Sequence, residues 1–191
     1  MLFIVIVGIY PIMMTNQLLV HYVDQGSMAY FLSTPYSRLQ ISIIQASVFL
    51  TGLLLIMICT VIAGIIGSTI FLSADHQLNI SQFISVNVVG FLLFFVVGGY
   101  CYLISSWLND EKRALGLATI VTIIFYGLDF IGKMSEQVEW LRNLSIFSLF
   151  RAGELFRATS FDFGHSFLLL IIGFVGFLLS SFIFVKRDLS L

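Results

Sequence analysis

The sequence predicts an all-α, polytopic membrane protein, and three observations support this fold class. Hydrophobic residues make up 59% of the 191 positions and charged residues only 10%, whereas a soluble domain carries about 25% charged residues. The hydrophobic residues gather in five runs, each long enough for a helix to cross a hydrocarbon core of roughly 30 Å. Short polar or charged stretches separate the runs. We therefore expect a single transmembrane domain over residues 1–191, in contact with membrane lipids.

Five transmembrane helices are expected from these runs. Their approximate bounds are 1–20, 39–72, 82–108, 114–131 and 165–185. The first run contains Pro11, which removes a backbone donor and bends a helix. The second run would form a helix of about 51 Å, longer than the hydrocarbon core. We therefore expect residues 40–45 to lie at or below the membrane interface.

A polar stretch at residues 24–38 separates the first two runs. It contains Gly26 and Pro35 and is too polar to cross a bilayer. Pro35 would end a helix before Arg38 opens the next one. We therefore expect a short helix at about residues 24–34.

A second unusual stretch, residues 132–164, mixes aromatic, aliphatic and charged residues. This mixture predicts two amphipathic helices that lie on the membrane surface. The first would be capped by Ser135, with Glu136 in its first turn and Arg142 near its end. The second would carry Arg151, Glu154 and Arg157 on one side.

The distribution of Lys and Arg predicts the orientation. One set of alternate loops holds Arg38, Lys112, Arg113, Lys186 and Arg187, and the other holds Lys133, Arg142, Arg151 and Arg157. In the second set the positive charges are nearly matched by acidic neighbours, and short turns weigh most in the positive-inside rule. We expect residues 24–38, the turn at 109–113 and the C-terminus in the cytosol, and residues 132–164 on the extracellular side.

Four polar residues within the spans are candidates for a pathway or for helix packing. Asn16 and Gln17 follow Pro11, and either face a polar pathway or pack within a kinked helix. Asn87 lies in the third run. Asp129 is the one acidic residue inside a span. It either pairs with Lys133 one turn later or makes a coupling or substrate contact.

Several other functions have little support in the sequence. His21, His76 and His165 are scattered, and Cys59 and Cys101 are single thiols in apolar runs, so we expect no metal site or disulfide. Residues 127–133 match G-x-x-x-x-G-K, but Met134 replaces the Ser or Thr that would bind Mg²⁺, and the match ends an apolar helix. The net charge of −1 gives no basic field for nucleic acid. We expect neither catalysis nor ATP binding in this chain.

Three motifs resemble the permease subunits of the ABC-2 exporter family. The first is Asp24-Gln25-Gly26-Ser27, followed by Leu32-Ser33-Thr34-Pro35 and by Arg38. The others are the charged turn at 109–113 and the closing Phe184-Val185-Lys186-Arg187-Asp188-Leu189. The similarity covers nearly all of the chain. The family often has Pro after Leu-Ser in the extracellular segment, where this sequence has Leu144-Ser145-Ile146.

The resemblance implies a membrane-spanning subunit of an ATP-driven exporter in the bacterial plasma membrane. Residues 24–34 would form the coupling helix, docked on a cytosolic ATP-binding subunit that supplies ATP and Mg²⁺. The residues that match the family's coupling motif are Asp24, Gly26, Ser27, Tyr30, Leu32, Pro35 and Arg38. A second permease chain, a copy or a relative, would complete the exporter.

Two expectations from the resemblance stay open at the level of sequence. The family has six spans and a cytosolic N-terminus, so the first span of its pattern is absent from the five expected here. The Phe-rich composition favours an amphipathic or hydrophobic cargo such as a small peptide. The alternatives are a non-transporting scaffold or sensor that docks an ATPase through the same helix, and a solute carrier that works alone.

Overall fold

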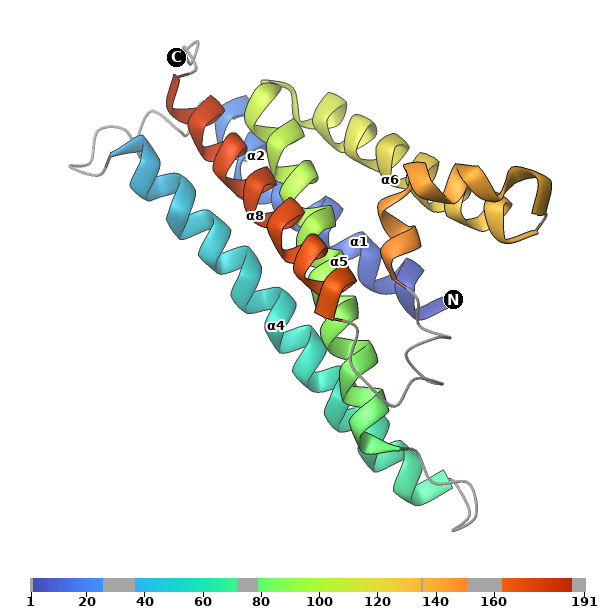
Figure 1. The fold of residues 1–191 in the computed structure, drawn as a ribbon. Coiled ribbons are helices and arrows are strands. Elements are labelled where there is room, and N and C mark those ends of the chain that lie inside the picture. Colours follow the sequence, from blue (N-terminus) through green and yellow to red (C-terminus); the bar gives the residue numbers. More distant parts are fainter. Residues whose placement is uncertain (1, 26–36, 72–78, 135, 151–162, 187–191) are drawn as a thin grey trace.

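The structure is a computed structural model that describes residues 2–25, 37–71, 79–134, 136–150 and 163–186 (Figure 1). These residues form helices and a few turn positions and contain no strand. The elements are α1 (Leu2–Leu18), α2 (Val20–Asp24), α4 (Arg38–Phe71), α5 (Ile80–Trp107), α6 (Glu111–Met134), the 3₁₀ segments η2 (Glu136–Leu144) and η3 (Ile146–Leu149), and α8 (Phe163–Lys186). The all-α fold class is therefore confirmed for the described part of the chain.

Four of the five predicted spans are helices long and apolar enough to cross a membrane. They are α4, α5, α6 and α8, and each begins and ends within three residues of the predicted bounds. The first predicted span corresponds to α1, which has 17 residues and so extends about 26 Å. It continues through Pro11 and is interrupted at Leu19, before α2. A fifth span therefore remains a prediction.

Local capping explains where α4 and α6 begin. The backbone N–H of Gln40 donates to Ser37 Oγ at 3.2 Å, and the Ser37 N–H donates to Gln40 Oε1 at 2.9 Å. This reciprocal pair is a capping box, which satisfies two of the free donors at a helix start. At the start of α6 a single side-chain cap is present, in which the Arg113 N–H donates to Asp110 Oδ1 at 2.9 Å. Both helices thus start at side chains that the sequence places just before an apolar run.

Helix α5 is the centre of the bundle. It contacts α1, α4, α6 and α8, and Figure 1 shows it running between them. Its contact with α8 is the closest, because Gly99 faces Gly173 and Gly176. A Cβ on Gly99 would lie 3.0 Å from the Gly173 carbonyl oxygen, and one on Gly176 would lie 3.1 Å from the Gly99 carbonyl carbon. The two backbones approach so closely because these residues have no side chain.

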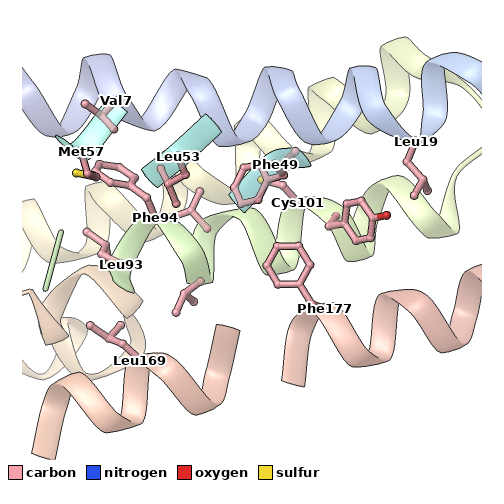
Figure 2. Close-up of a cluster of buried hydrophobic side chains, with 14 of the residues drawn as sticks. Val7, Leu19, Phe49, Leu53, Met57, Leu93, Phe94, Cys101, Leu169 and Phe177 are labelled. Carbon is pink, nitrogen blue, oxygen red and sulfur yellow. The ribbon is translucent and has the colours of Figure 1, made fainter. Parts of the chain in front are cut away.

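Aromatic and aliphatic side chains fill the space around α5. Figure 2 shows Phe49 and Leu53 from α4, Leu93 and Phe94 from α5, and Phe177 from α8 in one buried cluster. The Phe177 ring centre lies 5.8 Å from that of Phe49 and 5.2 Å from that of Phe95. Outward-facing residues are also apolar: Leu55, Ile62 and Leu178 are each more than half exposed. A bundle that is apolar on both its inner and outer sides is suited to a lipid environment.

The segment after α6 corresponds to the first of the two predicted amphipathic helices. Residues 136–144 form the 3₁₀ segment η2, and within it Val138 has non-helical backbone angles of φ −115° and ψ 15°. This kink divides the segment, so a regular α-helical face does not form. Ser145 then fixes η3 to α6, because its hydroxyl donates to the Phe125 carbonyl at 2.5 Å. The predicted cap Ser135 and the helix expected around Arg151, Glu154 and Arg157 lie outside the described residues.

Candidate functional site

The predicted coupling helix lies between α2 and α4. Of its candidate residues, Gly26, Ser27, Tyr30, Leu32 and Pro35 lie outside the described residues. Asp24 is the last residue of α2 and is exposed, and Arg38 is the first residue of α4. The contacts around these two flanking positions are therefore the structural information on this site.

The N-terminal flank is joined to α6 by a cluster that we call the first anchor: Asn16, His21, Asp24 and Glu111. His21 Nδ1 lies 2.8 Å from Glu111 Oε2. The Asn16 amide donates to Glu111 Oε1 at 3.5 Å, and the Glu111 N–H donates to Asp24 Oδ2 at 3.4 Å. Glu111 is in the first turn of α6, where the helix dipole favours a negative charge. One carboxylate thus joins α1, α2 and α6.

The C-terminal flank is joined to two other helices by the second anchor: Ser42, Gln45, Tyr102, Ser180 and Ser181. The Tyr102 hydroxyl donates to the Ser42 carbonyl at 2.9 Å, and Ser42 Oγ lies 3.1 Å from Ser181 Oγ. The Ser180 hydroxyl donates to the Tyr102 carbonyl at 2.9 Å. Gln45 Oε1 lies 3.5 Å from the Tyr102 hydroxyl.

The second anchor is buried except at the half-buried Ser181, and each of its hydroxyl groups is paired. Ser42, Tyr102 and Ser180 have no exposed surface. Hydrogen bonds between membrane helices stabilise the packing by about 0.6–2 kcal/mol each. The first turns of α4 are therefore firmly attached to the last turns of α5 and α8.

Sequence reasoning missed most of both anchors. His21 was treated as one of three scattered histidines, yet it pairs with Glu111, 90 positions later. The sequence did contain a topological signal for this pair, because the predicted orientation puts the end of the first span and the 109–113 turn on one side of the membrane. Among the described residues, no group of three or more His, Cys, Asp or Glu side chains is arranged to hold a metal ion.

Asp129 belongs to a separate charged cluster at the opposite end of α6. Its carboxylate accepts a hydrogen bond from Lys133, as one of the two interpretations predicted. Arg142 from η2 adds a second positive charge, with Nε 3.6 Å from Asp129 Oδ1. Asp129 is only 5% exposed, so this pairing compensates a buried charge.

Residues 127–133, which match the phosphate-loop pattern, lie within α6 and do not form a loop. A Cβ on Gly132 would lie 2.5 Å from Arg142 Cγ. This glycine therefore makes room for the arginine that reaches Asp129. Its packing role accounts for the second glycine of the pattern.

The four predicted pathway residues do not come together. Asn16 is buried in the first anchor and Gln17 is exposed. Asp129 lies about 27 Å along α6 from the Glu111 end. Asn87 is buried in α5, where its amide donates to the Phe83 carbonyl at 2.9 Å. They do not form one continuous polar pathway.

An apolar groove runs along α4 on the side facing α5 and α8. Its wider part, about 640 Å³, lies between α4, α5 and α8, and its narrower part, about 300 Å³, lies between α4 and α5. Leu54 and Phe91 line both parts, so the two are continuous. The polar residues of the lining are Thr51 in the wider part and Asn87 in the narrower one.

Comparison with known proteins identifies the family of this arrangement of helices. No curated protein matches the chain. Residues 1–184 match the family described as "Multidrug efflux system permease Rv1217c, C-terminal domain". This match includes every described helix in full except α8, which it includes up to residue 184. The chain therefore belongs to this family of permeases and is a multi-pass membrane component of an efflux system, not an enzyme in its own right.

Proposed function

We propose that the chain is the permease subunit of an ATP-driven exporter of the ABC-2 type, moved by separate cytosolic ATPase subunits that dock on residues 24–34. The observation that carries this proposal is the pair of anchors on either side of that segment. The first anchor leads into α1, α2 and α6, and the second leads into α4, α5 and α8. A force applied to the segment would therefore reach two different sets of helices.

The two sets meet at contacts that a relative movement would have to break or shift. The Tyr10 hydroxyl of α1 donates to the Phe49 carbonyl of α4 at 3.0 Å. The hydroxyls of Tyr100 in α5 and Thr122 in α6 lie 2.7 Å apart. Such isolated hydrogen bonds contribute only about 0.5–1.5 kcal/mol each. ATP binding by the partner would favour one arrangement of the sets through differential contact with the docking segment.

The grouping of charges at one end of the bundle supports a cytosolic position for the docking segment. In Figure 1 the end of α2, the start of α4, the turn before α6 and the end of α8 lie at the same end of the molecule. That end carries Arg38, Lys112, Arg113 and Lys186, whereas Lys133 and Arg142 lie at the other end of α6. The positive-inside rule then favours η2 and η3 on the extracellular side.

The remaining parts of the exporter are supplied by partners. ATP and Mg²⁺ belong to the ATPase subunits, and a second permease chain, a copy or a relative, completes the membrane part. The cargo is hydrophobic or amphipathic, and a small peptide is one candidate. The plasma membrane of a bacterium is the proposed location.

Loss of the first anchor tests the coupling. In proteoliposomes that contain the permease and its ATPase, Glu111→Ala removes the acceptor for both His21 and Asn16. Loss of a partly exposed hydrogen-bonded pair and of one further hydrogen bond should weaken the attachment of α6 to α1 and α2 by about 1 kcal/mol, so the cargo moved per ATP hydrolysed should fall. ATP hydrolysis itself should persist. Lys112→Ala, at the exposed neighbouring residue, is the control and should leave the ratio unchanged.

Accessibility of the docking segment gives a second, independent measurement. A Ser27→Cys variant should be protected from a water-soluble maleimide in the complex and should cross-link to the ATPase. Free labelling in the assembled complex would refute the docking position. ATPase stimulation without any movement of cargo would instead favour the scaffold or sensor function.

A further inference from the structure

The turn between α5 and α6 lies beside the proposed docking segment. The Glu111 N–H donates to Asp24 Oδ2 at 3.4 Å, and Asp24 is the last residue of α2. Ser27 follows three residues later, so the chain can separate it from Asp24 by at most about 11 Å. Figure 1 shows the turn at the same end of the molecule as the end of α2. A partner that docks at Ser27 therefore comes close to this turn.

The docking segment is small for a stable protein contact. Residues 24–34 are 11 positions, whereas each side of a stable interface contributes roughly 20–30 residues. The remaining contacts must come from other surface at the same end of the bundle. The α5–α6 turn is joined to the start of the segment by the first anchor, so it adjoins the proposed docking site.

The turn exposes residue types that dominate protein interfaces. Trp107 is the last residue of α5 and is 71% exposed. The Arg113 side chain is 79% exposed, and Asn109 between them is also exposed. Trp and Arg are enriched among the residues that carry binding energy at interfaces. Trp107, Asn109 and Arg113, which we call the turn patch, therefore have the composition of a protein-binding surface.

The charges of the turn indicate the chemistry of its partner. Asp110 caps α6 through the Arg113 N–H, and Glu111 Oε2 lies 2.8 Å from the ring of His21. Both acids are half-buried, whereas Lys112 and Arg113 are exposed. Arg113 Nε also lies 3.6 Å from Asp110 Oδ2, but an ion pair this exposed contributes little. The outward charge is therefore mainly positive, and an acidic protein surface complements it.

Backbone hydrogen bonds fix the shape of the turn. The Leu108 N–H donates to the Ile104 carbonyl at 3.2 Å and closes the end of α5. The Ala114 N–H donates to the Asp110 carbonyl at 3.0 Å at the start of α6. Only residues 108–110 lie between the two helices. The turn patch is thus held by helices on both sides, and a preformed surface loses little conformational entropy on binding.

We infer, on the basis of the proposed function, that the turn patch is a second contact surface for the ATPase subunit and binds an acidic part of it. Trp107 supplies apolar contact area, and the Arg113 guanidinium binds a carboxylate. The patch lies outside the coupling motif of residues 24–38. Because Glu111 of the first anchor belongs to the same turn, this contact also holds the start of α6 against the docked subunit.

Photo-cross-linking in the host cells tests the contact. Trp107 is replaced in the full chain by the photoreactive amino acid p-benzoylphenylalanine, and the products are identified by mass spectrometry. The expected product is a cross-link to a protein with a complete phosphate loop, G-x-x-x-x-G-K-[ST]. Trp140, which is 62% exposed and lies beyond the opposite end of α6, is the control and should capture no such protein.

Other products at residue 107 would refute the contact. Trp and basic residues at the end of a span also suit lipid headgroups, and a turn that meets only the membrane would give an adduct with the mass of a phospholipid. A second copy of the chain would give a cross-linked dimer. Either product without the ATP-binding protein would overturn the inference, as would capture of that protein at residue 140 as well.

Charge reversal tests the acidic partner surface. Arg113→Glu should lower the amount of the ATP-binding subunit that co-purifies with the permease by at least about fivefold, because repulsion replaces attraction. The cap of α6 is kept, since Asp110 accepts from the backbone N–H of residue 113. Arg113→Gln should give a smaller loss. Equal recovery of the subunit with the wild-type and Arg113→Glu chains would overturn the inference.

A cross-linker in the docking segment separates this inference from the proposed function. With p-benzoylphenylalanine in place of Ser27, the segment itself should capture the ATP-binding subunit. Capture at residue 27 but not at residue 107 would overturn the second contact and leave the docking segment in place. Capture at residue 107 alone would support the turn patch and refute the docking segment. Capture at neither position would refute both.

Discussion

A single added methyl group at Gly99 tests whether the contact between α5 and α8 holds the bundle together. In Gly99→Ala the new Cβ would lie 3.0 Å from the Gly173 carbonyl oxygen and 3.6 Å from Gly176 Cα. Both are backbone atoms of α8, so no side chain can turn away to make room. The helices must separate by a few tenths of an ångström, and overpacking of this kind costs about 1–3 kcal/mol.

A matched substitution removes the effect of helix propensity. Gly116 is also inside a helix, α6, but a Cβ there meets nothing within 4 Å. Alanine at either position gains up to about 1 kcal/mol of helix propensity, so the difference between Gly99→Ala and Gly116→Ala isolates the packing cost. We expect Gly99→Ala to be less stable than Gly116→Ala by about 1–3 kcal/mol, measured as loss of helical circular dichroism during titration with sodium dodecyl sulfate.

Two results test the close contact of α5 with α8. Equal unfolding free energies for the two variants would refute the close contact of α5 with α8. Gly176→Ala tests the same contact from α8, because its new Cβ would lie 3.1 Å from the Gly99 carbonyl carbon. The double variant Gly99→Ala/Gly176→Ala should lose less unfolding free energy than the two single variants lose in sum, because one separation of the helices relieves both clashes.

Two further substitutions separate stability from transport. Asp129→Asn should lower the unfolding free energy by about 1–3 kcal/mol, because Lys133 and the partly buried Arg142 lose their counter-charge. Efflux in proteoliposomes should be retained. A variant of normal stability without efflux would contradict this structural role. Tyr102→Phe should lower the unfolding free energy by about 1 kcal/mol, because the Ser42 carbonyl loses its donor. The control Ser85→Ala removes a hydroxyl that is bonded within its own helix, so it should lower the unfolding free energy less in the same titration.

The helices could be predicted from the sequence because their determinants are local. Apolar runs of 18 or more residues between polar stretches located α4, α5, α6 and α8 to within three residues. The pairing of Asp129 with Lys133 was equally accessible, since residues four positions apart share a helix face. The first predicted span was less well defined: it corresponds to a 17-residue α1 and a separate α2.

The contacts between helices could not be predicted, because they depend on which helices are neighbours. Nothing near His21 in the sequence identifies Glu111 as its partner, and nothing near Gly99 identifies Gly173. The same holds for Arg142, which reaches Asp129 only because Gly132 leaves space for it. The helix type of η2 could not be predicted for a different reason. Its charges and apolar residues suit either an α-helix or a 3₁₀ helix, and the irregular backbone at Val138 divides the segment.

The glycine contact between α5 and α8 also has a consequence for biosynthesis. Among the described helices α8 is the last to leave the ribosome, about 65 residues after the end of α5 by the positions of Trp107 and Gly173. Until then the face of α5 around Gly99 lacks α8 as its neighbour, and the Tyr102 carbonyl lacks the hydrogen bond from the Ser180 hydroxyl. Insertion of α8 into the membrane is thus the step that completes the packing around Gly99. A nascent chain that stops before it presents an unfinished helix face, the kind of feature that membrane quality-control proteases can recognise.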